Sequence, residues 1–169
     1  LALKLPRCPI YGLDTGATIA LAFAQRHPKL TTGLILNGIP IFPEAVRKRF
    51  LARYAPPFTI RWDGSHLTGL WTRIRDHRTF FPWYDRNDTG RLQRQLPSAN
   101  EFHMRTMGFL RAGNNYRHGY NTAFSFAAAS ALTKVKVPVT LIGVEGGLLA
   151  PLLRKVGLRP GQRVTWLKP

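Results

Sequence analysis

The sequence predicts an α/β protein built on a parallel sheet, and three features support that prediction. Two short apolar runs, at residues 8–11 and 33–37, flank a segment of helix length that is rich in small residues. Strand, helix and strand joined by short connections form a βαβ unit, which implies parallel strands and a right-handed crossover. A third apolar run, rich in β-branched residues, occupies residues 137–143 and has the character of a buried strand. The 169 residues, 44% of them hydrophobic, suffice for one ordinary domain with a core.

The first strand ends in a glycine-rich turn. Residues 8–11 lead directly into Gly12, Leu13, Asp14, Thr15 and Gly16. Glycines two positions before and after Asp14 permit a sharp turn that lifts its side chain above the strand end. A helix is expected at residues 17–26, ending before Pro28, because proline disfavours helical backbone at the residue ahead of it.

Asp14 therefore has two interpretations. The start of the following helix points its N–H groups toward this spot and favours negative charge there, which suits a nucleophile. An aspartate at a strand-to-helix junction is also an ordinary helix N-cap, whose carboxylate accepts a hydrogen bond from an N–H two or three residues later. The glycines on both sides and the preceding strand favour the nucleophile.

The second strand, residues 33–37, is followed by a region of different character. Gly38 and Pro40 end the strand. The region 43–133 has helical patterning, as at 44–54 and 99–110, and is unusually rich in large aromatic residues: Trp62, Trp71, Phe80, Phe81, Trp83 and Tyr84. Two further strands are expected at 137–143 and 163–167. The sequence thus predicts a strand–helix–strand core at 1–42, a helical region at 43–133 and C-terminal core strands at 134–169.

These features resemble the α/β-hydrolase superfamily. The matching segments are Tyr11-Gly12-Leu13-Asp14-Thr15-Gly16-Ala17, Arg26-His27-Pro28 and Gly33-Leu34-Ile35-Leu36-Asn37-Gly38. The region 43–133 looks like the helical cap that such enzymes insert between core strands, with similarity at Gly64-Ser65-His66-Leu67, Arg75-Asp76 and Phe80-Phe81-Pro82-Trp83-Tyr84. The resemblance implies a partial α/β-hydrolase fold, a parallel sheet with helices and an inserted helical cap.

Aspartate in place of serine at the elbow is similar to epoxide hydrolases and haloalkane dehalogenases. By that resemblance Asp14 is the nucleophile, and Gly12, Thr15 and Gly16 form the elbow and oxyanion site. A carboxylate is ionised at neutral pH, so it attacks an sp³ carbon without a base, and a histidine-activated water then hydrolyses the alkyl ester. Dehalogenases usually place tryptophan directly after the nucleophile to hold the halide, and Thr15 at that position counts against dehalogenation.

The rest of the implied triad is incomplete in the sequence. The acid should follow the strand at 137–143, where the chain reads Val144-Glu145-Gly146-Gly147, so Glu145 is the nearby carboxylate that could substitute. The catalytic histidine should follow the strand at 163–167, and none does. His27 lies at a helix end, and the other four histidines fall in the cap region without a positional match. The chain is expected to be a fragment or an incomplete member.

The cap region offers candidate pocket residues. In epoxide hydrolases, cap tyrosines donate hydrogen bonds to the epoxide oxygen, which makes Tyr54, Tyr84, Tyr116 and Tyr120, together with Trp83, candidates for lining a pocket. Asp63, His66, Asp76 and His77 invite a metal site, but their spacing fits no established ligand motif. No metal or other cofactor is therefore expected.

The formal net charge of +17 is the strongest global feature. It is spread along the chain, and no nucleic-acid-binding motif accompanies it, so a generally basic surface is expected and specific nucleic-acid binding is not. One cysteine, no apolar run of membrane-spanning length and no signal-peptide pattern favour a cytoplasmic protein without a membrane partner. The sequence does not indicate an oligomeric state.

The sequence thus favours a hydrolase, or a piece of one, that uses Asp14 on a small apolar ester, epoxide or halide. Two alternatives remain open. One is a non-catalytic module that keeps the α/β-hydrolase fold without the triad. The other is a basic module that binds nucleic acid through charge.

Overall fold

The computed structural model describes residues 6–92 and 95–168, which form two compact units. We call residues up to Arg47 together with those from Thr122 onward the core unit, and Lys48–Asn121 the helical unit. The sequence pattern predicts that residues 122–133 belong to the helical region. In the structure they join the core unit, because Ala128, Ala131 and Leu132 are buried in its hydrophobic core.

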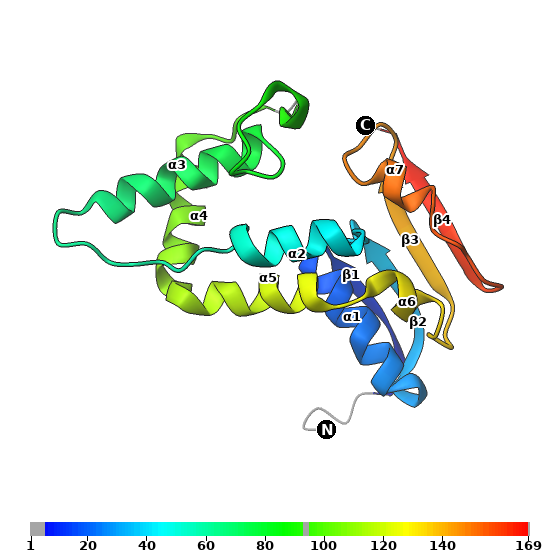
Figure 1. Ribbon diagram of the computed structural model, residues 1–169. Coiled ribbons are helices and arrows are strands. Elements are labelled where there is room, and N and C mark those ends of the chain that lie inside the picture. Colours follow the sequence, from blue (N-terminus) through cyan, green and yellow to red (C-terminus); the bar gives the residue numbers. More distant parts are fainter. Residues whose placement is uncertain (1–5, 93–94, 169) are drawn as a thin grey trace. The chain divides into compact units, whose positions relative to one another are not determined.

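The core unit is built on a four-stranded parallel sheet with strand order β1-β2-β3-β4 (Figure 1). The strands are β1 (Cys8–Leu13), β2 (Thr31–Asn37), β3 (Val139–Val144) and β4 (Gln162–Leu167). The predicted α/β class is therefore confirmed. β1 lies at the end of this order, and its register against β2 shifts between Cys8 and Pro9. An outer strand with an irregular start tolerates Pro9, since proline lacks the N–H that an inner strand needs on both sides.

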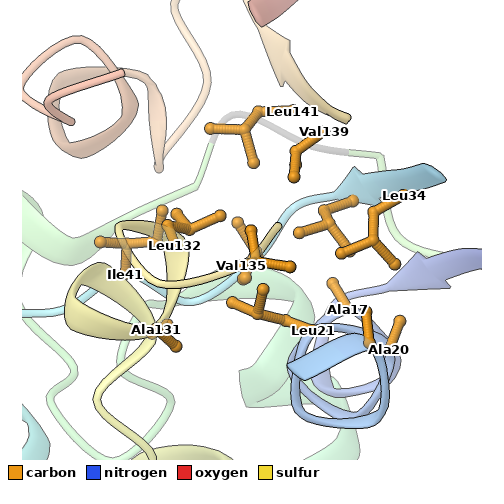
Figure 2. Packing of buried hydrophobic residues seen from close by; sticks show 14 of the residues in the cluster. Ala17, Ala20, Leu21, Leu34, Ile41, Ala131, Leu132, Val135, Val139 and Leu141 are labelled. Atoms are coloured by element: carbon orange, nitrogen blue, oxygen red, sulfur yellow. The ribbon is translucent and has the colours of Figure 1, made fainter. Parts of the chain in front are cut away.

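One face of the sheet is covered by helices. α1 (Thr15–Arg26), α6 (Ala128–Leu132) and α7 (Ala150–Leu153) pack there, and a 3₁₀ turn (Pro28–Leu30) connects α1 to β2. Figure 2 shows Leu21 of α1 beside Val135, and both belong to one hydrophobic cluster with the strand residues Leu34 and Leu141. α1 presents alanines at positions 17, 20 and 24, all at most 4% exposed, and these small side chains let the helix lie close to the sheet.

The opposite face of the sheet is open in the part of the chain described. Side chains alternate between the two faces of a strand, and paired residues of parallel neighbours share a face. The exposed positions follow this alternation through the register, with Tyr11 beside Ile35, and Val144 beside Leu167. Five large apolar side chains on this face are exposed: Tyr11, Leu13, Ile35, Val144 and Leu167.

The helical unit contains α3 (Ser65–Thr79) and α4 (Ala99–Ala112), with 3₁₀ turns at Asp88–Gly90 and Gly113–Asn115. α2 (Glu44–Arg53) and α5 (Tyr116–Ser125) run across the boundary between the two units. α4 begins with a reciprocal capping box, in which Ser98 and Glu101 each bind the other's backbone N–H. The core of this unit is formed by Leu70 and Ile74 of α3 against Phe102 of α4.

Across residues 6–92 and 95–168, no helix is both long enough and apolar enough to cross a bilayer.

Candidate active site

Asp14 occupies a tight turn between β1 and α1. Its backbone has φ 49° and ψ −116°, and it is the one non-glycine residue with positive φ in the described chain. Two backbone hydrogen bonds fix the turn: the Asp14 N–H donates to the Asn37 carbonyl (2.8 Å), and the Ala17 N–H donates to the Asp14 carbonyl (3.0 Å). A side-chain-bearing residue held in this region of backbone space is strained, and such strain concentrates at functional sites.

The two glycines that flank Asp14 at positions 12 and 16 differ in what they contribute to the turn. A Cβ added at Gly12 would lie 2.5 Å from the Gly16 carbonyl oxygen and 2.6 Å from the Ala17 Cα, so any side chain at Gly12 would displace the start of α1. A Cβ at Gly16 would meet nothing within 4 Å. The sharp turn therefore depends on Gly12 and on the positive φ of Asp14, whereas the sequence pattern predicts a role for both Gly12 and Gly16.

The end of β2 also shapes the turn, and no motif in the sequence indicates this contribution. Gly38 has φ 64°, and a Cβ there would lie 2.7 Å from the Asp14 Oδ1. The missing side chain of Gly38 thus leaves the space that the Asp14 carboxylate occupies. Asn37 supplies the carbonyl that holds the turn and also donates a side-chain hydrogen bond to the Tyr11 hydroxyl (3.1 Å). From the sequence, Gly38 is predicted only to end β2. The residues around it do not indicate that the turn after β1 lies beside it.

Asp14 occupies the N-cap position of α1 without capping the helix through its side chain. α1 begins at Thr15, and the Asp14 side chain makes no capping hydrogen bond to the helix. The N–H groups of Thr15 and Gly16 lie in the first turn, where backbone N–H groups have no acceptor within the helix. The exposed carboxylate of Asp14 is therefore placed beside donors that favour negative charge.

Glu145 lies at the same edge of the sheet as Asp14, because parallel strands end together. It follows β3, with β2 between it and the Asp14 turn, which corresponds to a strand separation of about 10 Å. Glu145 is exposed, and its backbone N–H donates to the Leu167 carbonyl (2.9 Å).

His27 is the histidine of the core unit, and it lies far from Asp14. It follows the last residue of α1, and a helix of 12 residues is about 18 Å long. Its ring packs on Phe23 with a centroid distance of 4.7 Å. The other histidines, at 66, 77, 103 and 118, belong to the helical unit. Within the core unit's described residues, no histidine stands beside Asp14.

The five aromatic residues predicted from the sequence to line a pocket come together within the helical unit. Tyr54 packs against Tyr84 and Tyr120 at ring-centroid distances of 6.4 and 5.4 Å, and Tyr116 packs against Tyr120 at 6.2 Å. The Trp83 indole N–H donates to the Tyr54 carbonyl (2.9 Å). These residues are separated by up to 66 positions, so their assembly is a tertiary feature. We call Tyr54, Trp83, Tyr84, Tyr116 and Tyr120 the aromatic cluster.

The tyrosine hydroxyls of the aromatic cluster differ in their hydrogen bonding. The Tyr116 hydroxyl accepts a hydrogen bond from Arg73 (2.7 Å) and donates to the Pro56 carbonyl. The Tyr84 hydroxyl is shielded from water and has no hydrogen-bond partner among the described residues. Burial raises the pKa of Tyr84, although the nearby guanidinium groups of Arg49 and Arg53 act in the opposite direction. Tyr84 therefore carries a protonated hydroxyl with an unused donor.

His77 is held neutral inside the helical unit. Its ring stacks on Trp83 and meets Tyr54 edge to face, and its Nε2 is shielded from water without a hydrogen-bond partner among the described residues. Burial lowers the pKa of His77 from 6.5 to about 3, and the Arg73 charge adds to this effect. Arg73 is 8% exposed and lies over the rings of Trp83 and Tyr116, which stabilise its charge.

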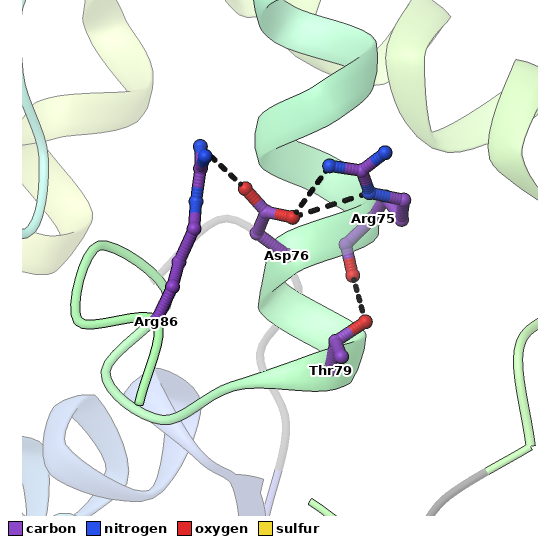
Figure 3. Close-up of polar contacts among 4 residues, drawn as sticks. All are labelled: Arg75, Asp76, Thr79 and Arg86. Atoms are coloured by element: carbon purple, nitrogen blue, oxygen red, sulfur yellow. Dashed lines mark hydrogen bonds and ion pairs between the residues drawn. The ribbon is translucent and has the colours of Figure 1, made fainter. Parts of the chain in front are cut away.

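The residues considered for a metal site have other roles. Asp63 accepts a hydrogen bond from the Ser65 N–H at the start of α3, which lowers the Asp63 pKa, and His66 Nδ1 accepts from the Arg61 N–H. Asp76, only 1% exposed, binds Arg75 (3.1 Å) and Arg86 (2.8 Å), as Figure 3 shows. The described residues contain no group of three or more metal-ligating side chains.

Comparison with known sequences gives only local matches. No family model matches the chain. A segment of 37 residues is 49% identical to a proline iminopeptidase of Arabidopsis thaliana, and one of 38 residues is 50% identical to a proline iminopeptidase of Xylella fastidiosa. Each match covers 22% of this chain and 10% or 12% of the relative.

Comparison with solved structures covers nearly the whole chain. A haloalkane dehalogenase from Agrobacterium tumefaciens matches with a TM-score of 0.59 at 17% identity, and the epoxide hydrolase CorEH matches with 0.60 at 16%. An E-2-(acetamidomethylene)succinate hydrolase matches with 0.61 at 16% identity. Each match covers 99% of this chain and 60–62% of the solved structure, so the chain spans about three fifths of their length. The parallel sheet, the turn at Asp14 and these matches together show that the chain has the α/β-hydrolase fold.

Proposed function

We propose that this chain carries the nucleophile of a hydrolase, and that the nucleophile is Asp14. The observation that carries the proposal is the strained backbone of Asp14 at the tip of the β1–α1 turn. The exposed carboxylate does not cap α1, and the missing side chain of Gly38 makes room for it. An ordinary turn aspartate needs none of these features.

The chemistry follows from the use of a carboxylate. One Asp14 oxygen attacks an sp³ carbon of a small apolar epoxide or halide, and the C–O or C–halogen bond breaks with its electron pair on the leaving atom. The product is an alkyl ester of Asp14, and in the case of an epoxide the alkoxide formed by ring opening takes a proton from water to give a hydroxyalkyl ester. Hydrolysis of the ester by water releases an alcohol (a diol from an epoxide) and one proton to the solvent, and regenerates the carboxylate. The N–H groups of Thr15 and Gly16 stabilise negative charge that develops beside the turn. Small esters remain a further substrate class, and Thr15 in place of tryptophan makes epoxides the preferred one.

Hydrolysis of the ester needs a base, so the experiment measures whether the ester accumulates. His27 lies at the other end of α1, and Glu145 is the carboxylate at the same sheet edge as Asp14. A chain that attacks but hydrolyses slowly accumulates the ester. We therefore expect styrene oxide to add its full mass once to the protein, and peptide mapping to place the addition on Asp14.

Matched variants separate this reaction from unspecific alkylation. Asp14→Asn should lose the adduct, whereas Asp63→Asn, at another exposed carboxylate, should keep it. Gly38→Ala should reduce labelling, since its Cβ would lie 2.7 Å from the Asp14 Oδ1. Gly69→Ala, in α3 of the helical unit, would place a Cβ with nothing within 4 Å and should leave labelling unchanged. Equal labelling of the wild type and Asp14→Asn would overturn the proposal.

A non-catalytic module with the same fold is the second candidate. It is favoured by the lack of a histidine beside Asp14 within the core unit's described residues, and by the glycines at 146 and 147 after Glu145. Its signature is a folded protein that forms no adduct at Asp14 with either an epoxide or an alkyl bromide.

A further inference from the structure

A cavity of about 400 Å³ lies at the end of the sheet opposite to Asp14. It is lined by residues 134–138, which lead into β3, and by residues 159–162, which lead into β4. Asp14 follows the C-terminal end of β1, whereas this cavity lies at the N-terminal ends of parallel strands. A six-residue strand spans about 20 Å, so the cavity and the Asp14 turn are separate sites.

Hydrogen bonds join the residues that line the cavity to adjacent residues of the same chain. The Arg159 guanidinium donates to the Thr133 carbonyl, and the Gln162 side-chain amide donates to the Leu132 carbonyl (2.7 Å). The Arg159 N–H donates to the Gln162 Oε1 (3.2 Å), and the Val139 N–H donates to the Gly161 carbonyl (3.0 Å). The two lining segments are thus fixed to one another before any ligand arrives, which lowers the entropic cost of binding.

The lining is cationic and has no carboxylate to neutralise it. Lys134, Lys136 and Arg159 line the cavity, and none of them makes an ion pair with a described residue. The one acidic residue of the core unit after Thr122 is Glu145, which lies beyond the other end of β3. Three cations around one depression favour an anion, and the fork of an arginine matches the geometry of a phosphate.

We propose that this cavity binds a phosphate or pyrophosphate group of a small molecule. Its volume lies within the range of about 300–1,000 Å³ that is typical of small-molecule sites. Val135 and Val137 are buried in the hydrophobic core, whereas Lys134, Lys136 and Arg159 are exposed, so the anion binds to these three cations. The inference is independent of the hydrolase proposal, because it uses no residue at the Asp14 end of the sheet.

Calorimetric titration with inorganic pyrophosphate at fixed ionic strength tests the proposal. Lys134→Gln/Lys136→Gln removes two lining charges that no side-chain hydrogen bond holds, so the fold should persist and circular dichroism should be unchanged. We expect this variant to bind pyrophosphate at least tenfold more weakly. The matched control Lys29→Gln/Lys168→Gln removes two exposed charges outside the cavity and should change affinity less than twofold.

The same titration distinguishes a site from general charge attraction. Succinate at equal ionic strength should bind at least tenfold more weakly than pyrophosphate, because it presents fewer acceptor oxygens to the three cations. Equal weakening by both double variants, or no binding of pyrophosphate by the wild type, would overturn the proposal.

Discussion

The strained backbone of Asp14 is the residue-scale feature on which the proposed chemistry depends. A residue with a Cβ at φ 49° costs on the order of 1–3 kcal/mol, and the surrounding structure must hold it there. The hydrogen bonds to Asn37 and from Ala17 do so from both sides of the turn. A fold that needed only a turn would place glycine at this position.

Replacing Asp14 with glycine should therefore stabilise the protein while it abolishes the adduct. Glycine adopts positive φ without a steric penalty, so we expect Asp14→Gly to raise the free energy of unfolding by about 1 kcal/mol after the entropy of the unfolded glycine is offset. Asp14→Ala removes the same charge but keeps a Cβ, so it should not be stabilised. Urea unfolding of the wild type, Asp14→Gly and Asp14→Ala measures the differences in the free energy of unfolding. If Asp14→Gly is less stable than Asp14→Ala, the backbone at this position is not strained.

At the scale of elements, the pattern of small and apolar residues was sufficient to predict β1, α1 and β2 in order. The same pattern did not predict features that depend on contacts with another helix or strand. The helix start at Thr15 and the role of Gly38 depend on β1 and β2 lying side by side, and neither residue signals this contact in its own neighbourhood. α6 falls in the predicted helical region, but its buried residues belong to the hydrophobic cluster that contains α1, a contact that its short run of alanines does not indicate in the sequence.

The buried histidine of α3 should make the helical unit sensitive to acid. The pKa of His77 is about 3 in the folded protein and about 6.5 when unfolded, so the unfolded chain binds more protons between these values. Stability is therefore complete above pH 6.5 and falls as the pH drops through that window, by up to about 1.4 kcal/mol per pH unit. From pH 6.5 to 5, above the usual range of carboxylate titration, we expect a loss of about 1–2 kcal/mol.

Tryptophan fluorescence in a Trp166→Phe background measures this loss, since the remaining tryptophans lie in the helical unit. His77→Phe keeps an aromatic ring against Trp83 and removes the titrating group, so its stability should be nearly flat over the same range. His118→Phe, at an exposed position, should retain the pH dependence of the parent protein. A His77→Phe protein with the parent's slope would show that another group titrates.

At the scale of the whole molecule, composition predicted a basic surface but not where apolar surface remains. Alternation within single strands cannot show which face lacks a covering layer, because that depends on elements outside the strand. The structure shows helices on one face, and a row of exposed apolar side chains on the other. In the solved structures that share the fold, about two fifths of the chain has no counterpart here.

This open face should make the isolated chain self-associate when its charge is screened. Contiguous apolar surface favours association, whereas a net charge of +17 opposes it at low ionic strength. Sedimentation velocity should therefore show larger species as salt rises, opposite to the response of an electrostatic complex. Ile35→Lys/Leu167→Lys places two charges on the open face, where these side chains are 39% and 46% exposed, and should shift the protein toward monomer. Ile60→Lys/Leu96→Lys adds the same charges at exposed positions of the helical unit and should not shift the protein toward monomer. An equal shift in both variants would mean that net charge, and not the open face, controls association.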